Sequence, residues 1–214
     1  FTSFISCQKE DLKQKEFTLN SITSIKGGFK PGDPINYGKV KDIDGNSYKT
    51  VMIGDQEWMA QNLQVTRYRN GDPIQNILDN NEWQITTKGT WCYFNNDQAN
   101  NSVYGKLYNF YAISDPRGIA PKGWHVASHE EWITLTNYLG GDAIAGGSLK
   151  STGTINEGTG LWYSPNNGAT NICGFSGLPG GARFYNGIFS TTGPAGIWWT
   201  STIYDANSAW SKVI

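Results

Sequence analysis

The stretch that decides the fold occupies residues 174–183 and reads GFSGLPGGAR, and residues 193–202 follow it as GPAGIWWTST. Glycine permits positive φ angles and close approach of two backbones, whereas tryptophan needs a large apolar cavity. We therefore expect this part of the chain to be irregular in backbone and yet well packed. It is a structured loop core and not a linker.

The composition favours an extracellular fold of strands and loops. The 214 residues suffice for one large domain with a proper core or for two small ones. Aromatic residues alternate with Gly, Asn, Ser and Thr where long aliphatic helices would otherwise be expected. The net charge is −1 and no block of Lys or Arg occurs, which argues against nucleic acid or an anionic membrane surface as a partner. No apolar run reaches the roughly 18 residues of a membrane span.

The N-terminal residues resemble a targeting signal. Residues 4–7, FISC, resemble the end of a bacterial lipoprotein signal peptide, in which a small residue precedes the lipidated cysteine. The following QKED resembles the acidic surface-export signal of Bacteroidota lipoproteins. We expect residues 1–6 to be a signal-peptide remnant, Cys7 to carry a lipid at the cell outer membrane, and the polar residues 7–37 to be a tether. The alternative is an ordinary free cysteine in an unstructured tail.

A hairpin is predicted directly after the tether. Apolar and polar residues alternate within residues 38–43 and within residues 48–53, on either side of Asp44-Gly45. Asp-Gly is a strong turn signal because both positions tolerate positive φ. Trp58 and Leu63 continue the same sheet as core candidates.

Two helices are predicted. Residues 104–113 place Leu107, Phe110 and Tyr111 at helical spacing. The second helix, from His129 to about Leu139, follows a Ser128 and Glu131 capping box and stops at a Gly-Gly pair. Beyond it, Gly and Asn dominate up to residue 171, and a loop of this length is usually functional.

Several separate motifs occur in a recognisable order. They are residues 50–63 (TVMIGDQEWMAQNL), 106–112 (KLYNFYA), 121–126 (PKGWHV), 130–132 (EEW), 174–181 (GFSGLPGG) and 198–202 (WWTST). Together they resemble the Fibrobacter succinogenes major paralogous domain. The resemblance runs from about residue 40 to the end, so we take residues 38–214 as one domain.

This family is similar to C-type lectin-like domains, and residues 123–132 look like the second helix entry of formylglycine-generating enzymes. The resemblance implies an α+β fold of the C-type lectin-like type. Two helices would flank small antiparallel sheets, and a long irregular loop region would precede the final strands. Family members are mostly secreted proteins or surface lipoproteins, in agreement with the signal at Cys7.

The chain departs from the family pattern at two cysteines. Members commonly have Cys where this chain has Ala120, and they usually end in a strand with a second Cys, whereas residues 211–214 read SKVI. The resemblance therefore implies that both cysteines of one disulfide are absent and that the closing strand is either missing or truncated. Cys92 and Cys173 can pair in an oxidising compartment, and two buried free thiols are the alternative.

The sequence predicts a protein that is not an enzyme and that needs no metal or cofactor. His125 and His129 have no metal-ligand spacing, and the adjacent Glu130 and Glu131 point to different sides of their helix. The formylglycine-generating relatives use reactive cysteines near the end of the domain, and neither Cys92 nor Cys173 fits a version of that arrangement.

A binding role is the stronger prediction, with an extracellular glycan or protein as the partner. In C-type lectin-like folds the long loop region holds the ligand, and here it spans roughly residues 146–196. Its aromatic and amide groups suit stacking on a sugar and bonding to its hydroxyls. The candidate ligand-binding residues are Trp162, Tyr163, Asn166, Asn167, Arg183, Tyr185 and Asn186.

Two alternatives stay open for these residues. Trp162 and Tyr185 can instead fill the loop core while the asparagines make turns, and Arg183 can bond loop carbonyls instead of an acidic ligand. The domain would then be a structural or assembly component of the cell surface with no small-ligand site.

Overall fold

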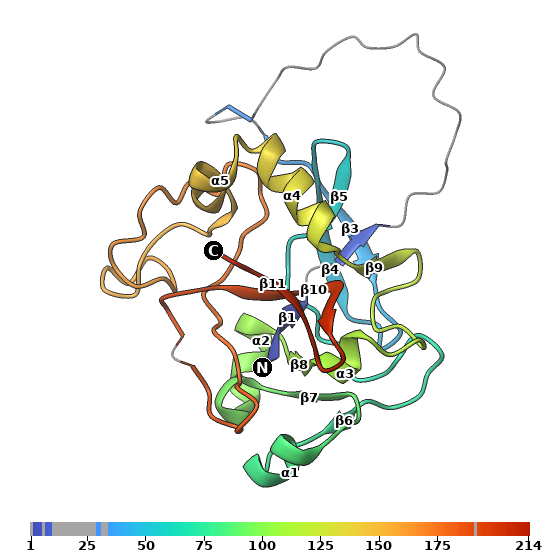
Figure 1. The fold of residues 1–214 in the computed structure, drawn as a ribbon. Helices are drawn as coiled ribbons and strands as arrows, with labels where there is room; N and C mark the ends of the chain where they lie inside the picture. Colours follow the sequence, from blue (N-terminus) through green and yellow to red (C-terminus); the bar gives the residue numbers. More distant parts are fainter. Residues whose placement is uncertain (1, 6, 10–28, 31–33, 191) are drawn as a thin grey trace, which may run out of the picture.

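The computed structural model describes residues 2–5, 7–9, 29–30, 34–190 and 192–214 (Figure 1). Of the predicted signal-peptide remnant and tether, residues 1, 6, 10–28 and 31–33 lie outside the described residues. The strands are β1 (Thr2–Ile5), β2 (Cys7–Lys9), β3 (Tyr37–Lys41), β4 (Ser47–Ile53), β5 (Gln56–Met59), β6 (Gln75–Asn76), β7 (Thr90–Cys92), β8 (Leu107–Asn109), β9 (Trp124–Val126), β10 (Ile197–Asp205) and β11 (Ser208–Val213). The helices are α1 (Asn80–Ile85), α2 (Asn101–Tyr104), α3 (Phe110–Ile113), α4 (His129–Tyr138) and α5 (Asp142–Leu149), with 3-10 turns η1 (Phe94–Asn96) and η2 (Gln98–Asn100).

The described strands form two sheets, and the domain is α+β as expected. The six-stranded sheet has the order β11-β10-β1-β8-β7-β6, and the five-stranded sheet has the order β3-β4-β5-β2-β9. In Figure 1 the β10–β11 pair crosses the middle of the molecule, α4 and α5 lie above it, and α1 lies at the opposite end. The sheets are small and the helices few, which is compatible with the predicted architecture.

The N-terminal segment has a different place from the one predicted. Residues 2–5 are an inner strand between β10 and β8, and residues 7–9 are an inner strand between β5 and β9. The sequence predicts a signal-peptide remnant and a tether here. The composition of residues 2–9 does not predict strands, because the hydrogen bonds between strands are made by backbone groups and require no particular side chains.

The predicted hairpin is present. β3 pairs with β4 from Tyr37 opposite Val51 to Lys41 opposite Ser47, and Gly45 in the connecting loop has a φ of 86°. Both Trp58 and Leu63 are fully buried, as the sequence predicts.

The second predicted helix is present as α4 with both halves of its capping box. Ser128 Oγ accepts from the Glu131 backbone N–H at 3.2 Å, and the Glu131 carboxylate accepts from the Ser128 N–H at 2.7 Å. Gly140 and Gly141 follow the helix with φ of 99° and 96°, the region where glycine is favoured.

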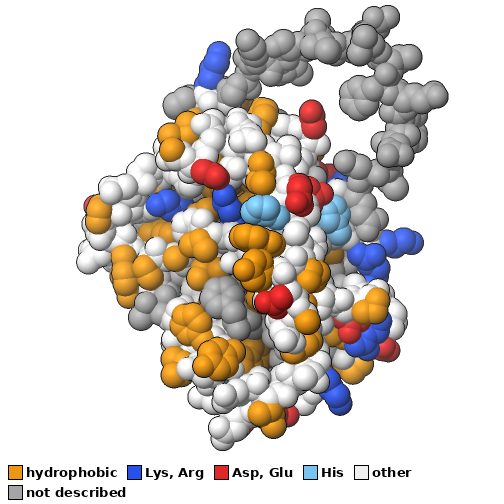
Figure 2. All heavy atoms as spheres, in the orientation of Figure 1, with side chains coloured by type: hydrophobic (Ala, Val, Ile, Leu, Met, Phe, Trp, Pro, Cys, Tyr) orange, Lys and Arg blue, Asp and Glu red, His pale blue; other side chains and the backbone are white. Residues whose placement is uncertain are grey.

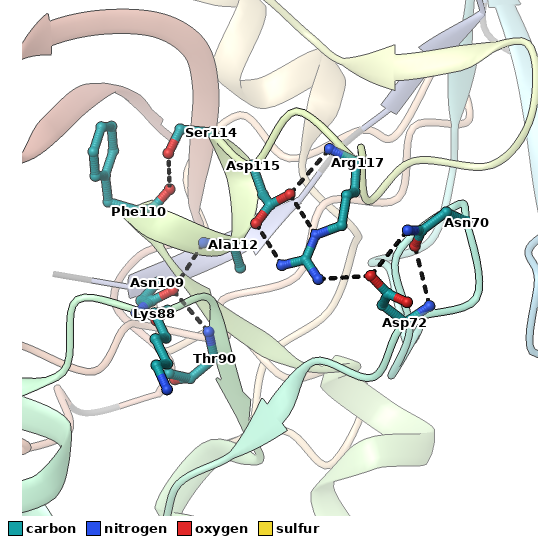
Figure 3. A network of polar contacts seen from close by, with 10 residues as sticks. All are labelled: Asn70, Asp72, Lys88, Thr90, Asn109, Phe110, Ala112, Ser114, Asp115 and Arg117. Carbon is teal, nitrogen blue, oxygen red and sulfur yellow. Dashed lines mark hydrogen bonds and ion pairs between the residues drawn. The ribbon is translucent and has the colours of Figure 1, made fainter.

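The first predicted helix is only partly present. Leu107 belongs to β8, and only α3 is helical. Asn109 explains the change, because its side-chain oxygen accepts from both the Thr90 and Ala112 N–H groups at 3.0 Å (Figure 3). One side chain thus joins β7 to the first turn of α3, and as the N-cap it begins the helix directly where the strand ends.

Figure 3 also shows how the next loop is held at the surface. The Arg117 guanidinium bonds both Asp115, at 2.8 Å, and Asp72, at 2.9 Å. Its carbon lies 3.9 Å from the Tyr68 ring centre, a cation–π distance. This network ties the loop after α3 to residues 68–72.

Two helices lie in stretches that the sequence assigns to loops. α5 occupies part of the predicted long loop, and it buries Ala145 and Leu149, which are four residues apart on one helical face. α1 buries only Trp83. The local sequence signal is weak in both cases because so few apolar residues mark the buried face.

Residues 174–183 pack as expected into an aromatic core. The Phe175 ring lies 5.6 Å from Trp132 and 5.9 Å from Trp198, and Trp58 lies 4.9 Å from Trp132. A Cβ added at Gly177 would lie 2.8 Å from Ile214 Cδ1 and 3.1 Å from Leu149 O. Glycine at this position therefore lets the loop backbone approach the core.

The cap of α4 predicts a pH-dependent stability. Burial raises the pKa of Glu131, but hydrogen bonds from His125 and from the Ser128 N–H outweigh burial and hold it below the ordinary 4.5. Because the folded pKa is depressed, this stabilisation is present above pH 4.5 and is lost as pH falls through the folded pKa. We expect Glu131→Gln to lower the free energy of unfolding by about 1–2 kcal/mol at pH 7.

Urea denaturation of both proteins from pH 7 to pH 3 measures this difference, which should shrink toward pH 3. An equal difference at both ends of the range would contradict the role of the carboxylate charge.

No helix among the described residues has the length and apolar character to cross a membrane.

Candidate functional site

A cleft of about 230 Å³ opens beside the aromatic core, and we call it the core cleft. Three groups of residues that are distant in sequence form most of its lining: residues 59–62 and 64 at and after the end of β5, residues 102, 103 and 105 around the end of α2, and residues 175–178. The volume lies below the roughly 300–1,000 Å³ of most small-molecule sites. It therefore suits a single small residue of a larger ligand.

The floor of the core cleft is apolar and rigid. Phe175 and Trp198, which are 3% and 1% exposed, belong to the aromatic core and also line the cleft. Trp198 Nε1 donates to Asn62 Oδ1 at 2.9 Å, and Asn62 Nδ2 donates to the Tyr104 carbonyl at 2.9 Å. These bonds fix the Asn62 amide between the floor and α2.

The rim carries an exposed aromatic ring and polar groups. Tyr37 is 40% exposed, and its hydroxyl donates to the Gly174 carbonyl at 3.2 Å. Lys49 Nζ lies 5.1 Å from the centre of the Tyr37 ring. Gln61 Oε1 accepts from the Lys49 N–H at 2.8 Å, and the Gln61 amide nitrogen has no hydrogen-bond partner among the described residues. Lys49 is the only charged side chain among the described residues that line the cleft.

A buried lysine supports one wall of the cleft from behind. Lys106 Nζ donates to the Gln64 carbonyl at 2.7 Å and to Asn101 Oδ1 at 3.0 Å, and it lies 4.9 Å from the Trp91 ring centre. Burial lowers the pKa of Lys106 to about 8. Two of its donors bond oxygens of the protein, so Lys106 holds Gln64 in place, and it is not among the residues that line the cleft.

Of the predicted ligand-binding residues, Trp162 lies in the loop core. It is 3% exposed, and its Nε1 donates to Ser151 Oγ at 3.0 Å and to the Gly177 carbonyl at 3.2 Å. The neighbouring Tyr163 is 48% exposed, and its ring lies over Gly193, where any Cβ would clash. Trp162 is therefore scaffold, and the alternative reading of this residue is the one that its burial supports.

The two predicted asparagines lie beside a second, shallow hollow that residues 153–157 and 164–169 line. Asn166 Nδ2 donates to the Ser151 and Gly153 carbonyls at 3.0 and 3.1 Å, which ties two loop segments together. Asn167 is exposed at the edge of the same hollow. Asn166 thus holds the loop, and Asn167 alone of the pair is free to meet a ligand.

Arg183 is fully buried, so it cannot anchor a ligand from solvent. Its guanidinium donates to the carbonyls of Ile77, Leu78 and Gly187 and to Asn80 Oδ1, at 2.8–3.0 Å. Its burial therefore speaks against the ligand contact that is one of the two alternatives for this residue. The reading that it bonds loop carbonyls is confirmed.

Tyr185 and Asn186 stand at the tip of a tight loop beside α1. Tyr185 is 68% exposed, and Asn186 Oδ1 accepts from the Ile188 N–H at 3.2 Å. Neither residue lines the core cleft or the shallow hollow. The structure thus distributes the seven predicted residues over a packed core, a hollow and a loop tip.

Of the two alternatives for Cys92 and Cys173, the structure has the buried free thiols and not the disulfide. Both thiols are free and fully buried, and Cys173 Sγ donates to the Ser148 carbonyl at 3.2 Å. Burial raises the pKa of Cys92 to about 12 and that of Cys173 to about 11, so neither is a reactive thiolate at neutral pH. Cys7 is also a buried free thiol, and lipidation at this position requires residues 7–9 to leave their sheet.

A second exposed surface lies on the β10–β11 hairpin, and we call it the hairpin surface. The Trp210 ring is 45% exposed, stacks on His129 at 5.1 Å and meets Tyr204 edge-on at 5.2 Å. Figure 2 shows hydrophobic side chains beside the histidines near the middle of this face. His125 is engaged elsewhere, because its Nε2 lies 2.8 Å from Glu131 Oε1.

Sequence reasoning missed the core cleft. Tyr37 lies in the predicted tether, and the amides of Gln61 and Asn62 lie in the motif of residues 50–63, which by itself indicates only the family. The polar residues Gln61 and Asn62, which follow the buried run Trp58-Met59-Ala60, were a usable signal. No sequence pattern predicts that these residues lie beside residues 175–178, which are more than a hundred residues further along the chain. Among the described residues, no group of three or more His, Cys, Asp or Glu is placed to hold a metal ion.

Comparisons with known proteins agree with the motifs. Residues 51–214 match the family model of the Fibrobacter succinogenes major domain. No curated protein and no solved structure matches the chain. Because the matched region covers well over half of the sequence, the chain belongs to the Fibrobacter succinogenes major domain family.

Proposed function

We propose that this domain is a non-catalytic binding module of the cell surface that recognises an extracellular glycan, with one sugar residue in the core cleft. The C-type lectin-like relationship is part of the same proposal. The observation that carries it is the rim of the cleft, where an exposed tyrosine ring stands beside the unpaired amide nitrogen of Gln61 over an apolar floor.

The chemistry of the lining favours a sugar over a charged metabolite. A sugar ring has an apolar C–H face that stacks on an aromatic ring and hydroxyls that bond amides. Lys49 is the one charged side chain on the described lining, and its Nζ faces the Tyr37 ring. The cleft therefore supplies neutral donors and acceptors around an apolar floor, which fits a neutral sugar.

The proposal includes anchoring at the outer membrane through Cys7. In the anchored form residues 7–9 have left the five-stranded sheet, because the Cys7 thiol is 0% exposed within it. Metabolic labelling with a clickable fatty acid, with Cys7→Ala as the control, tests the anchor. Equal labelling of both proteins would contradict it.

The binding test uses a glycan array and then titration of the best ligand. We expect Tyr37→Ala to weaken binding about tenfold or more, equivalent to about 1.4 kcal/mol, because the stacking face is lost. Tyr37→Phe keeps the ring and should bind nearly as the unaltered chain does. Gln61→Ala should also weaken binding, because the side chain is exposed and its amide nitrogen is unpaired.

Tyr185→Ala is the matched control, since Tyr185 is an exposed tyrosine outside the cleft. It should leave binding unchanged. Loss of binding in Tyr185→Ala with retention in Tyr37→Ala would move the site to the loop tip. Absence of binding to any glycan would refute the lectin proposal.

A second candidate is a structural or assembly role, and the hairpin surface favours it. Ile203 and Tyr204 are 52% and 65% exposed beside Trp210, so an apolar and aromatic surface faces solvent. Exposed apolar patches of this kind often mark protein contacts. In that case Trp210→Ala, and not Tyr37→Ala, should abolish retention of the protein in its surface assembly.

A further inference from the structure

We propose that the slot filled by residues 2–5 and 7–9 is a strand-binding site whose occupant can be exchanged, so that these residues of one copy can enter the slot of a second copy. This inference goes beyond the glycan site and does not depend on it. It concerns the chain in which residues 2–5 precede an unmodified Cys7, and not the lipid-anchored form, in which this slot has lost its occupant.

The slot is an inner position in both sheets. Ile5 lies opposite Trp199 of β10, Ser3 lies opposite Tyr108 of β8, and Cys7 lies opposite Val126 of β9. Without these two strands, β8, β10, β5 and β9 would each present an unpaired edge toward the slot. Unpaired edges within a fold are a strong template for another strand, so an empty slot would be refilled.

Residues 2–5 and 7–9, which occupy the slot, are separated in sequence from the rest of the domain. They precede the family-matched region, which begins at residue 51, and residues 10–28 separate them from the next described residue. Main-chain ladders supply much of their attachment, and such ladders form equally well with a strand from another chain. The ion pair between Lys9 and Glu57, at 3.0 Å, is at the surface and contributes little.

The specificity of the slot depends on the side chain at position 7, which is Cys7 in this chain. Cys7 is 0% exposed and belongs to the same apolar cluster as Tyr48, Tyr108 and Trp199. A small residue is needed at this position, because large neighbours surround it on the described elements. A second copy of this chain brings that residue in the same register, which makes it the occupant we propose.

Exchange is energetically permitted because the contacts in the slot are identical in both forms. A tethered segment competes at an effective concentration of roughly a millimolar, so the closed monomer dominates in dilute solution. Swapping of an identical element is a low-cost route to a dimer as the concentration rises. Exchange should therefore increase with protein concentration.

A disulfide trap tests this on the full chain. Directly opposed residues in an antiparallel ladder have Cα atoms about 4.5–5.5 Å apart, within the range for a disulfide. An acceptor chain with Cys7→Ala and Val126→Cys is mixed with unaltered donor chain under mild oxidation. A disulfide from donor Cys7 to acceptor residue 126 forms only if the donor segment enters the acceptor slot.

We expect a covalent dimer whose yield rises about tenfold for a tenfold rise in concentration below the effective concentration of the tether. Peptide mapping should place the bridge between positions 7 and 126. The matched control is a Cys7→Ala donor, which should give no dimer, because Cys92 and Cys173 are buried. Unchanged circular dichroism of the acceptor confirms that it is folded.

The single variant Val126→Cys completes the test. It should form an intrachain bridge to Cys7 when dilute. An intrachain bridge without any interchain product at high concentration would overturn the proposal, because the segment would then be fixed in its own chain. Absence of both products would also overturn it, because the segment would then lie outside the slot, as the tether prediction requires.

Discussion

Replacement of Arg183 by methionine is expected to lower the free energy of unfolding by about 3–5 kcal/mol, equivalent to roughly 10 °C in Tm for a chain of this size. The Arg183 guanidinium is fully buried between the Trp83 and Phe189 rings, at 4.1 and 5.0 Å from their centres. It donates to acceptors in two parts of the chain that lie about a hundred residues apart.

The expected cost comes from the acceptors that remain. Methionine fills much of the same volume but donates nothing, so the carbonyls of Ile77, Leu78 and Gly187 lose their partner inside the protein. An unpaired buried polar group costs about 1–3 kcal/mol, and several such costs do not add fully.

Thermal and urea denaturation measure this effect. Arg183→Lys should recover only part of the stability, because an ammonium cannot reproduce the planar fork of donors. Hydrogen exchange should show that α1 and residues 180–190 lose protection together. A change in Tm of only one or two degrees would contradict the view that Arg183 joins these segments.

The second large effect concerns Trp162, which is expected to be a stability residue and not a ligand contact. Trp162→Ala removes a buried ring and should lower the free energy of unfolding by about 3–5 kcal/mol. It also removes two hydrogen bonds from the indole N–H, to Ser151 Oγ and to the Gly177 carbonyl. Gly177 lines the core cleft, so weaker binding by this variant follows from a disturbed cleft wall.

Trp162→Phe separates ring packing from hydrogen bonding. It keeps most of the buried ring and should cost about 1–2 kcal/mol for the lost donor. Urea denaturation gives the stability, and titration at a temperature where the variant is folded gives the affinity. Full stability of Trp162→Ala with complete loss of glycan binding would restore Trp162 as a direct ligand contact.

The functional part of the sequence was harder to read than the fold. An aromatic residue beside asparagines suggests a sugar site, yet the same residue types are used to fill and close loops, as Trp162 and Asn166 show. Only burial distinguishes the two uses. Tyr185, in a similar local sequence, is 68% exposed.

The sequence by itself determined the family, the β3–β4 hairpin and the capped helix α4, because each has a local signal. A turn dipeptide, a capping box and a Gly-Gly stop act within a few residues of themselves. The packed character of residues 174–183 and 193–202 was also predictable, since glycines allow close backbone approach and the rings of Phe175, Trp198 and Trp199 need large apolar cavities.

The tertiary structure alone decided where the site lies and what the N-terminal segment does. Tyr37, Gln61 and Phe175 share one cleft only because the hairpin, the residues after β5 and the final loops converge there. Residues 2–5 and 7–9 become inner strands because long-range backbone pairing satisfies them, and such pairing leaves almost no trace in the pattern of side chains.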